Sequence, residues 1–551
     1  MAGLPRRRRR RRTLGARRPG TLRAAERVVD ARDAVRPAPR APAVHPARGR
    51  TAAGHRRRPR RRHPQRRGHP DHDAVRPQPH RCLPLPRRAR GQRRLPGRRR
   101  RTGGRTHRAH PVSDTFWAEL AWVGDVPAAQ VRIEVDDGVI VAVVPGTDPA
   151  TGDERLPGIV LPGFANAHSH AFHRALRGRT HTGRGSFWTW RTSMYALAER
   201  LTPDSYHRLA LAVYAEMALA GVTVVGEFHY LHHGPGGAPY ADPNAMAAAL
   251  RQAAADAGVR LTLLDTCYLT GGIGQPLGGA QLRFGDGTAV RWAERASDLR
   301  DDPMTRVGAA IHSVRAVPPD AVAVVAEWAA RRGAPLHVHL SEQVAENEAT
   351  LAAYGRTPAR LLADHGALTD RTTAVHANHV DDGDIALLGA ARSAVCACPT
   401  TEQDLADGLS PARALASAGS PLCLGSDQHA VVDLLAEARL LEMHERLGTG
   451  RRGSFTPAEL VAALTHRGHT ALGWPGNGRI AVGAAADLVA VRTDTVRTAG
   501  TDPAQIALTA GAADVHTVVA GGRTIVRDGR HERGDVAGLF AEAIDPLWEF
   551  A

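Results

Sequence analysis

The stretch "GIVLPGFANAHSH", residues 158–170, decides how this chain folds. It begins as an apolar run typical of a buried strand, passes through Gly163, and ends on His168 and His170 with one residue between them. In a strand, residues two apart project to the same side. The two imidazoles therefore face the same way from one strand end, an arrangement that suits one metal ion. An HxH pair alone is a weak signal, so the rest of the chain has to support it.

Seven more strand-like apolar runs follow, and helical-looking stretches such as residues 202–220 and 242–258 separate most of them. Strand alternating with helix eight times predicts an α/β fold of the (β/α)8 barrel type, whose active site lies at the C-terminal ends of the strands. Most of the runs end in His, Asp, Glu, Tyr or Arg, so polar residues fall at that same place. The eight runs span residues 158–170, 221–230, 260–269, 306–315, 335–342, 373–380, 393–400 and 421–427.

Both ends of the chain outside this region are rich in short β-like runs. Near the beginning, the turn "DDG" (136–138) joins two alternating segments in the manner of a hairpin. Similar runs lie at 478–494 and 515–530. We expect these ends to form one small β-sandwich domain. The predicted division gives residues 113–160 and 478–551 to the sandwich and residues 161–477 to the barrel.

The first 112 residues are a tail of different composition. Residues 1–110 carry 37 Arg against 5 acidic residues, whereas residues 111–551 carry 36 Arg against 50, so a net charge of +18 conceals an acidic body. The tail has no aromatic residue and no serine. It cannot bury enough apolar surface to offset its ordering entropy, so we expect it to be disordered. It also lacks the apolar core of a secretory signal.

Two interpretations of the tail are open. It is either an arm for nucleic acid or an anionic surface, or a stretch translated from an upstream start that is not part of the working protein. The chain contains no lysine, which indicates a GC-rich gene and favours the second interpretation. Five cysteines without a paired CxxC spacing predict neither a disulfide framework nor a zinc ribbon. No apolar stretch is long enough to span a membrane, and we expect a cytoplasmic protein.

Further potential metal ligands end three later runs. The fifth run supplies His337, His339 and Glu342, the sixth His376 and His379, and the eighth Asp427. Three neutral imidazoles and one carboxylate suit zinc, or iron in the same geometry, and a site that leaves a position open for water is catalytic. Because the chain has no lysine, a carbamylated lysine cannot bridge two metals, which favours a mononuclear centre.

The order HxH, then His with Glu, then His, then Asp resembles the amidohydrolase superfamily, in its mononuclear aminohydrolase branch. Within that branch the chain is most similar to the formimidoylglutamate deiminases, over residues 113 to about 545. The HxH pair and the final Asp are shared across the superfamily. The stretches that carry the closer resemblance are "HSHAFHRALRG", "SFWTWRTSMY", "GEFHYLHH", "IHSVRAV", "HVHLSEQ", "CPTTEQDLADG" and "LGSDQH".

The resemblance implies roles for individual residues. The metal ligands would be His168, His170, His339 and Asp427. Glu342 would carry a proton to the leaving ammonia, His376 would hold the attacking hydroxide, and Asp427 would accept the proton of water. The substrate would be bound by His173, Arg191, Tyr230, His312 and Arg315. His173 departs from the family pattern, which has glutamine there, although histidine can still donate a hydrogen bond.

The implied reaction is the hydrolytic deamination of N-formimidoyl-L-glutamate in histidine degradation. One divalent metal, zinc or else ferrous iron, would activate water near neutral pH. Two arginines match a substrate with two carboxylates, because a guanidinium fork binds a carboxylate in two places. We expect a homodimer with no membrane or nucleic-acid partner.

Two other functions stay open. The chain could be a zinc aminohydrolase for a guanine, triazine or adenosine-like ring, whose pocket would favour aromatic or amide groups over two arginines. Alternatively, the Arg-rich tail could make it a nucleic-acid-binding protein in which the barrel is secondary.

Overall fold

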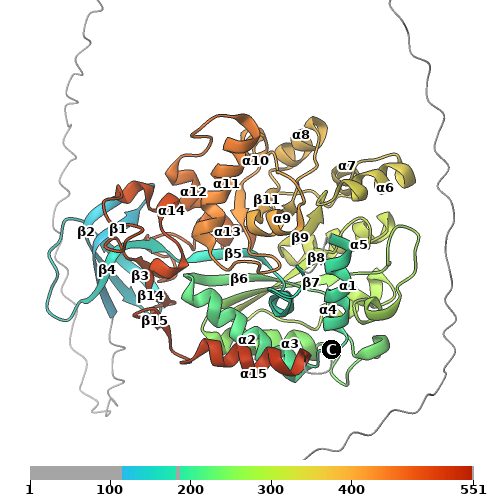
Figure 1. Cartoon of the computed structure of the whole chain (residues 1–551), viewed down its shortest axis with the longest axis horizontal. Helices are drawn as coiled ribbons and strands as arrows, with labels where there is room; N and C mark the ends of the chain where they lie inside the picture. The colour runs from blue at the N-terminus through green and yellow to red at the C-terminus, as the bar shows by residue number, and fades with distance from the viewer. Residues whose placement is uncertain (1–113, 182–186, 549–551) are drawn as a thin grey trace, which may run out of the picture. The chain divides into compact units, whose positions relative to one another are not determined.

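A parallel eight-stranded barrel forms the centre of the computed structural model, which describes residues 114–181 and 187–548 and, within 187–198, the side chains from residue 189 onward. The predicted tail lies outside the described residues. The strands follow one another in chain order around the barrel, and a parallel bridge between Ser169 and Asp427 joins the first to the last (Figure 1). Each strand matches one of the eight predicted runs. They are β5 (Phe164–Ser169), β6 (Val222–His229), β7 (Arg260–Cys267), β8 (Thr305–Ile311), β9 (Leu336–Leu340), β10 (Thr372–His376), β11 (Ala394–Ala397) and β12 (Leu422–Leu424).

Helices alternate with these strands and cover the barrel. Every residue of β6 and β7 is buried, as expected for parallel strands covered on both faces. The (β/α)8 fold predicted from the alternating pattern is therefore confirmed. The α-helices are α1 (Phe187–Ala198), α2 (Pro203–Leu219), α3 (Ala245–Ala257), α4 (Ala289–Ala296), α5 (Pro319–Arg332), α6 (Val344–Tyr354), α7 (Pro358–Asp364), α8 (Asp382–Ala391), α9 (Pro399–Leu405), α10 (Ala412–Ala418), α11 (Leu434–Thr449), α12 (Pro457–Leu464), α13 (His466–Ala471), α14 (Ile506–Thr509) and α15 (Val536–Trp548).

A second sheet draws strands from both ends of the described chain and forms a sandwich-like domain, as predicted (Figure 1). Its order is β16-β15-β14-β13-β4-β1-β2-β3, with β1 parallel to β4 and the other neighbours antiparallel. The "DDG" turn joins β2 to β3, and Gly138 there has a φ of +76° and leaves no room for a Cβ beside the backbone oxygen of Gly521. The strands are β1 (Asp114–Val123), β2 (Val126–Asp136), β3 (Val139–Val144), β4 (Glu154–Pro162), β13 (Leu488–Val491), β14 (Val515–Ala520), β15 (Arg523–Arg527) and β16 (Arg530–His531).

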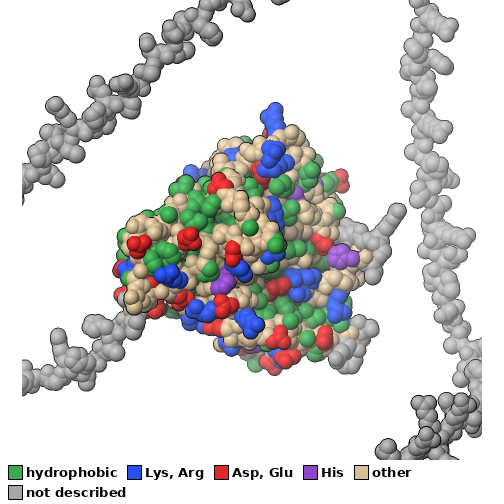
Figure 2. Space-filling view, turned by 60° about the vertical axis from the view of Figure 1, so that its left-hand side comes forward, with side chains coloured by type: hydrophobic (Ala, Val, Ile, Leu, Met, Phe, Trp, Pro, Cys, Tyr) green, Lys and Arg blue, Asp and Glu red, His purple; other side chains and the backbone are tan. Residues whose placement is uncertain are grey.

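The surface of this folded part mixes both signs of charge. On the face shown in Figure 2, acidic and basic side chains lie interspersed among apolar and neutral ones. In the described residues, no helix is both long enough and apolar enough to cross a membrane. Cys396, Cys398 and Cys423 are buried free thiols that pack in the core around β11 and β12.

Candidate metal centre

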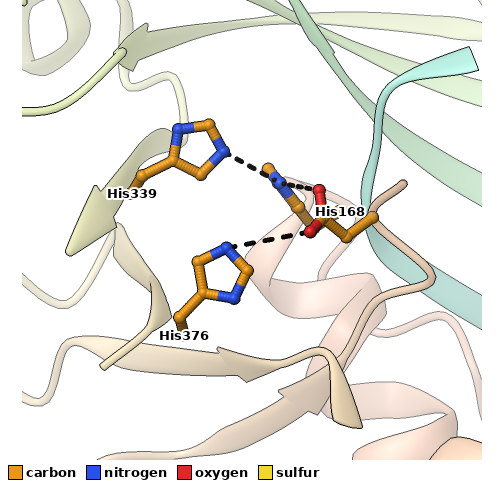
Figure 3. Close-up of side chains that lie close together, drawn as sticks. His168, His339 and His376 are labelled. Atoms are coloured by element: carbon orange, nitrogen blue, oxygen red, sulfur yellow. Dashed lines mark hydrogen bonds and ion pairs between the residues drawn. The ribbon is translucent and has the colours of Figure 1, made fainter. Parts of the chain in front are cut away.

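Four predicted metal ligands converge at the C-terminal ends of the barrel strands. His168 closes β5 and His170 follows it, His339 comes from β9, and Asp427 follows β12. His168 Nε2 lies 3.1 Å from His339 Nε2 and 3.2 Å from Asp427 Oδ1. His170 Nε2 lies 3.3 Å from His339 Nε2 and 3.4 Å from Asp427 Oδ1. Figure 3 shows the ring of His339 directed toward His168 and the ring of His376 directed toward a carboxylate oxygen of Asp427.

Hydrogen bonds fix the tautomers of two of these rings. The Nδ1 atom of His170 faces the backbone oxygen of Phe228 at 3.0 Å, and that of His339 faces the oxygen of His312 at 2.8 Å. A carbonyl only accepts, so both Nδ1 atoms carry the proton. Burial lowers the pKa of His170 to about 3 and that of His339 well below its usual value, so both rings are neutral. Their bare Nε2 lone pairs thus face each other beside a carboxylate, an arrangement that fits a cation between them.

His376 and Glu342 stand beside this cluster. His376 Nε2 lies 3.8 Å from Asp427 Oδ2 and 3.9 Å from Glu342 Oε1. The backbones of His376 and Asp427 are both left-handed, with φ of 69° and 44°, strain of a kind that gathers at functional sites. Burial alone would lower the pKa of His376, but the carboxylates of Glu342, Glu402 and Asp427 outweigh it and raise the pKa to about 10.

Glu402, on α9, is a site residue that sequence reasoning missed. Its carboxylate is buried, accepts a hydrogen bond from the backbone N–H of Cys398 at 2.9 Å, and lies 3.5 Å from His376 Nδ1. It therefore orients the His376 ring from the side away from Asp427. The signal available was its place in "CPTTEQDLADG", a stretch that already carried the family resemblance.

A buried polar network behind the ligands was also missed. Glu227, from β6, accepts hydrogen bonds from Ser169 Oγ at 2.8 Å and from the backbone N–H of Ala171 at 2.7 Å, and so fixes the segment that holds His168 and His170. Burial raises the pKa of Glu227 to about 7. His337 takes no part in the site, because its Nε2 lies 3.1 Å from the backbone oxygen of Ala471.

A cavity of about 530 Å³ opens beside the cluster. His170, His339, Glu342, His376 and Asp427 line it. All five predicted substrate-binding residues line it as well, so the structure brings together the two groups that the sequence could only place on separate strands. Those five are His173, Arg191, Tyr230, His312 and Arg315.

Arg191 reaches the cavity from helix α1 rather than from a strand end. Its Nε donates to the hydroxyl of Tyr195, one helical turn away, and its Nη2 lies 3.5 Å from the hydroxyl of Tyr268. Gln281 Nε2 also donates to both hydroxyls, at 3.1 and 3.0 Å. Tyr195 and Tyr268 are thus further cavity residues that the sequence did not reveal.

His173, at the position where the family pattern has glutamine, is buried between aromatic rings. Its Nε2 lies 2.8 Å from the hydroxyl of Tyr230, and its ring lies at a tilt of 36° to that of His170, with centroids 4.5 Å apart. Burial lowers the pKa of His173 well below its usual value, so the ring is neutral. A neutral imidazole can both donate and accept here, much as an amide would.

A second buried cluster of potential ligands lies on the neighbouring strands β6 and β7. It contains His229, His232 and Asp265. Both oxygens of Asp265, however, accept hydrogen bonds from Arg295 at 2.9 Å, and Oδ1 also accepts one from Trp292 Nε1 at 2.8 Å. The guanidinium of Arg295 is already the cation of this cluster, so the cluster has a structural role and is not a metal site.

A (β/α)8 barrel that carries a cluster of potential metal ligands and a cavity at the C-terminal ends of its strands is typical of the metal-dependent barrel hydrolases. Comparison with known proteins narrows the class. The model of the amidohydrolase family matches residues 159–525, and the chain belongs to that family.

Comparison with individual relatives supports the assignment to this family. A formimidoylglutamate deiminase from Pseudomonas aeruginosa is 36% identical over 436 residues, which cover 76% of this chain and 95% of the relative. An 8-oxoguanine deaminase from the same organism is 30% identical over 429 residues, which cover 74% and 92%. The crystal structure of an amidohydrolase from Brucella melitensis matches with a TM-score of 0.74 at 33% identity, covering 79% of this chain and 99% of that one. The protein is therefore a metal-dependent hydrolase that acts on C–N bonds.

Proposed function

We propose that this enzyme hydrolyses N-formimidoyl-L-glutamate to N-formyl-L-glutamate and ammonia, using one zinc ion per chain. The observation that carries the proposal is that Arg191 and Arg315 line the same cavity as His170, His339 and Asp427. A small amidine with two carboxylates needs both groups of residues at once. The similarity to a formimidoylglutamate deiminase supports the same substrate.

His168, His170, His339 and Asp427 would hold the zinc ion. Three imidazoles and a carboxylate are a ligand set that zinc accepts, and Fe²⁺ in the same geometry is the alternative. When bound in such a site, zinc makes water a nucleophile near neutral pH. The absence of lysine leaves no carbamylated bridge for a second ion.

The chain's own acidic and basic groups would move the protons. Burial would raise the pKa of Asp427, but the histidines around it hold the pKa well below its usual range. Asp427 is therefore ionised and can accept a proton from the attacking water. Burial raises the pKa of Glu342, which suits it to deliver a proton to the leaving nitrogen. His376, held by Glu402, would donate a hydrogen bond to the attacking oxygen.

The substrate's two carboxylates would pair with Arg191 and Arg315. A buried guanidinium–carboxylate pair is directional and strong, and His312 and Tyr230 line the same cavity to complete the hydrogen bonds. His173 would bind the amidine or a carboxylate together with Tyr230, to which it is already bonded.

A second candidate function is deamination of a heterocyclic ring. The cavity is also lined by Trp190, Tyr195, Tyr230, Tyr268 and Phe284, against which a flat ring could stack. The relative named 8-oxoguanine deaminase adds weight to this alternative. Two arginines in the wall favour the dicarboxylate.

Ammonia release measured side by side for N-formimidoyl-L-glutamate, 8-oxoguanine, guanine and adenosine tests the proposal. We expect the first substrate to give the highest kcat/KM. Arg191→Met and Arg315→Met should each lower that kcat/KM by ~10- to 10³-fold, since a lost charged hydrogen bond costs ~1.5–3 kcal/mol and its unpaired partner costs more. The exposed Arg331→Met is the matched control. A preference for a ring substrate would overturn the proposal.

The same arginine variants distinguish the two carboxylates. A variant whose arginine holds the side-chain carboxylate should lose less activity on N-formimidoylglycine, which lacks that group. The nucleic-acid alternative predicts salt-dependent binding of random DNA that disappears when residues 1–112 are removed.

We further propose that the enzyme acts in histidine degradation as a cytoplasmic homodimer. Light scattering on the purified full chain tests the dimer, and a monomer at micromolar concentration would contradict it.

A further inference from the structure

A second cavity of about 710 Å³ adjoins the substrate cavity. Arg315 lines both cavities, together with Arg191, Tyr268 and His312. The two carboxylates nearest to Arg315 are divided between them, because Glu342 lines only the substrate cavity and Glu346 lines only the second one. Arg315 therefore stands in the wall between two spaces, with a carboxylate in the lining of each.

Glu346 lies in the first turn of α6, four residues after Glu342, and is 1% exposed. Its Oε2 lies 3.8 Å from Arg315 Nε, and within the described part of the chain no hydrogen bond of normal length reaches either of its oxygens. Burial raises the pKa of Glu346 to about 7, against the opposing effect of Arg315. A buried carboxylate is costly without a partner, and Arg315 is the only cation that pairs with it among the described residues.

Arg315 is also within reach of Glu342, since Nη2 lies 4.0 Å from Glu342 Oε2. Glu342, the group assigned to proton delivery, is the other described carboxylate within 4.0 Å of this guanidinium. Glu346 competes for the same guanidinium at its Nε edge. Because Glu342 lines the substrate cavity, Nη2 lies on the side of that cavity, where a carboxylate of the substrate can also bind to the guanidinium.

We infer that Glu346 is a positioning residue, which holds Arg315 at its Nε edge so that the guanidinium fork faces a carboxylate of the substrate. The inference rests on the proposed dicarboxylate substrate. It assigns a function to a buried charge that neither metal binding nor proton transfer uses. The 3.8 Å separation leaves room for the contact to shorten when the substrate fills the site, as such contacts commonly do.

Glu346→Gln tests the inference in the full-length, metal-loaded enzyme. We expect KM for N-formimidoyl-L-glutamate to rise ~10- to 100-fold, the size of effect that misplacing a substrate-binding group produces. kcat should stay within about 3-fold and metal content should be unchanged, because Glu346 contacts neither the reacting atoms nor the ligands. Glu348→Gln, an exposed position on the same helix, is the matched control and should leave both constants unchanged.

A double-mutant cycle separates positioning from general destabilisation. In an Arg315→Met background, Glu346→Gln should change KM by less than about 2-fold, because there is no guanidinium left to position. Arg315→Met alone strands a buried carboxylate, so it should lower Tm, and adding Glu346→Gln should restore part of that loss. Should Glu346→Gln fail to fold, Glu346→Asp, which keeps the charge one methylene shorter, should show an intermediate KM.

Two results would overturn the inference: a KM for Glu346→Gln equal to that of Glu348→Gln, or the same rise in KM with and without Arg315. Failure of the proposed function looks different, because the parent enzyme would then release no ammonia from N-formimidoyl-L-glutamate. In that case, calorimetric measurement of the binding of glutarate, a plain dicarboxylate, tests whether Glu346 positions Arg315. Weaker binding by Glu346→Gln than by the parent supports the positioning role, and equal binding rejects it.

Discussion

Two buried clusters of histidine and carboxylate lie on neighbouring strands of this barrel, and they differ in one component. The first joins His168, His339, His376 and Asp427, and the second joins His229, His232 and Asp265. In both clusters the potential ligand atoms lie within 4.8 Å of one another. By residue type and spacing alone, either could be taken for a metal site.

The difference is the source of positive charge. Arg295 donates to both oxygens of Asp265 and to both oxygens of Asp286, at 2.9–3.0 Å, so the second cluster contains its own cation. Among the described residues, only histidines pair with Asp427 in the first cluster. The neutral rings of His170 and His339 turn lone pairs toward each other beside Asp427, an arrangement that fits a bound divalent metal. A cluster is thus defined by its charge balance as much as by its ligand types.

The largest effect that tests this comparison should come from His168→Ala. Removing one ligand should lower metal occupancy, and the loss of metal assistance, worth several kcal/mol, should reduce kcat/KM to below about a thousandth of the parent value. Metal analysis and ammonia release measure both quantities. His365→Ala, at a half-buried histidine on the barrel surface, is the control. Full occupancy with full activity would mean that His168 is not a ligand.

The converse change in the second cluster is Arg295→Met. It leaves Asp265 and Asp286 buried without a cation, which should lower the free energy of unfolding by ~3–5 kcal/mol, because breaking a buried pair strands its partner. The metal content of the folded enzyme should equal that of the parent enzyme. Urea unfolding followed by circular dichroism, with metal analysis on the same sample, measures the two outcomes. A loss below about 1 kcal/mol would remove the distinction between the clusters.

Glu342→Gln examines chemistry inside the first cluster without removing a ligand. The amide keeps the shape of the side chain but cannot carry a proton, so we expect kcat to fall at least ~10²-fold with the metal retained. Single-turnover ammonia release gives the rate, and Glu348→Gln serves as the control. Near-normal turnover with full metal would assign proton delivery to another group.

Local periodicity in the sequence predicted the barrel and placed His168, His339 and Asp427 at strand ends, because strand runs that end in polar residues are short-range patterns. His168 and His170 are two residues apart, and His339 and Glu342 are three. The active-site end of a parallel barrel then brings separate runs together without further information.

The residues that were missed depend on contacts between distant segments. Arg295 reaches Asp265 across 30 residues, and Trp292 reaches it across 27, with no periodic signal in either. Arg191 lies on helix α1, outside all eight strand-like runs, so only packing brings it to the cavity. Glu402, on α9, lies 3.5 Å from Nδ1 of His376, which ends β10, and no local pattern in the sequence indicates this contact. Sequence patterns place residues on elements, and packing decides which side chains share a charge.

The smallest expected effect is on the pH dependence of the free energy of unfolding, and it concerns the second cluster alone. Asp286 accepts hydrogen bonds from Arg295 at 2.9 and 3.0 Å and lies 3.0 Å from His233 Nε2. Burial would raise the pKa of Asp286, but His233 and Arg295 outweigh it and hold the pKa well below the usual 3.8. A carboxyl whose pKa is depressed by folding contributes stability above its unfolded pKa, and that stability is lost as the pH falls below 3.8 because the unfolded chain then binds the extra proton.

Asp286→Asn should therefore lower the free energy of unfolding by ~1.5–3 kcal/mol near neutral pH, the usual size for a charged hydrogen bond. The difference from the parent should persist down to about pH 5 and shrink at about pH 3.5. Urea midpoints at these pH values measure it, with the exposed Asp370→Asn as the control. A difference that stayed constant across the whole range would show that Asp286 stabilises the cluster through shape and not through charge.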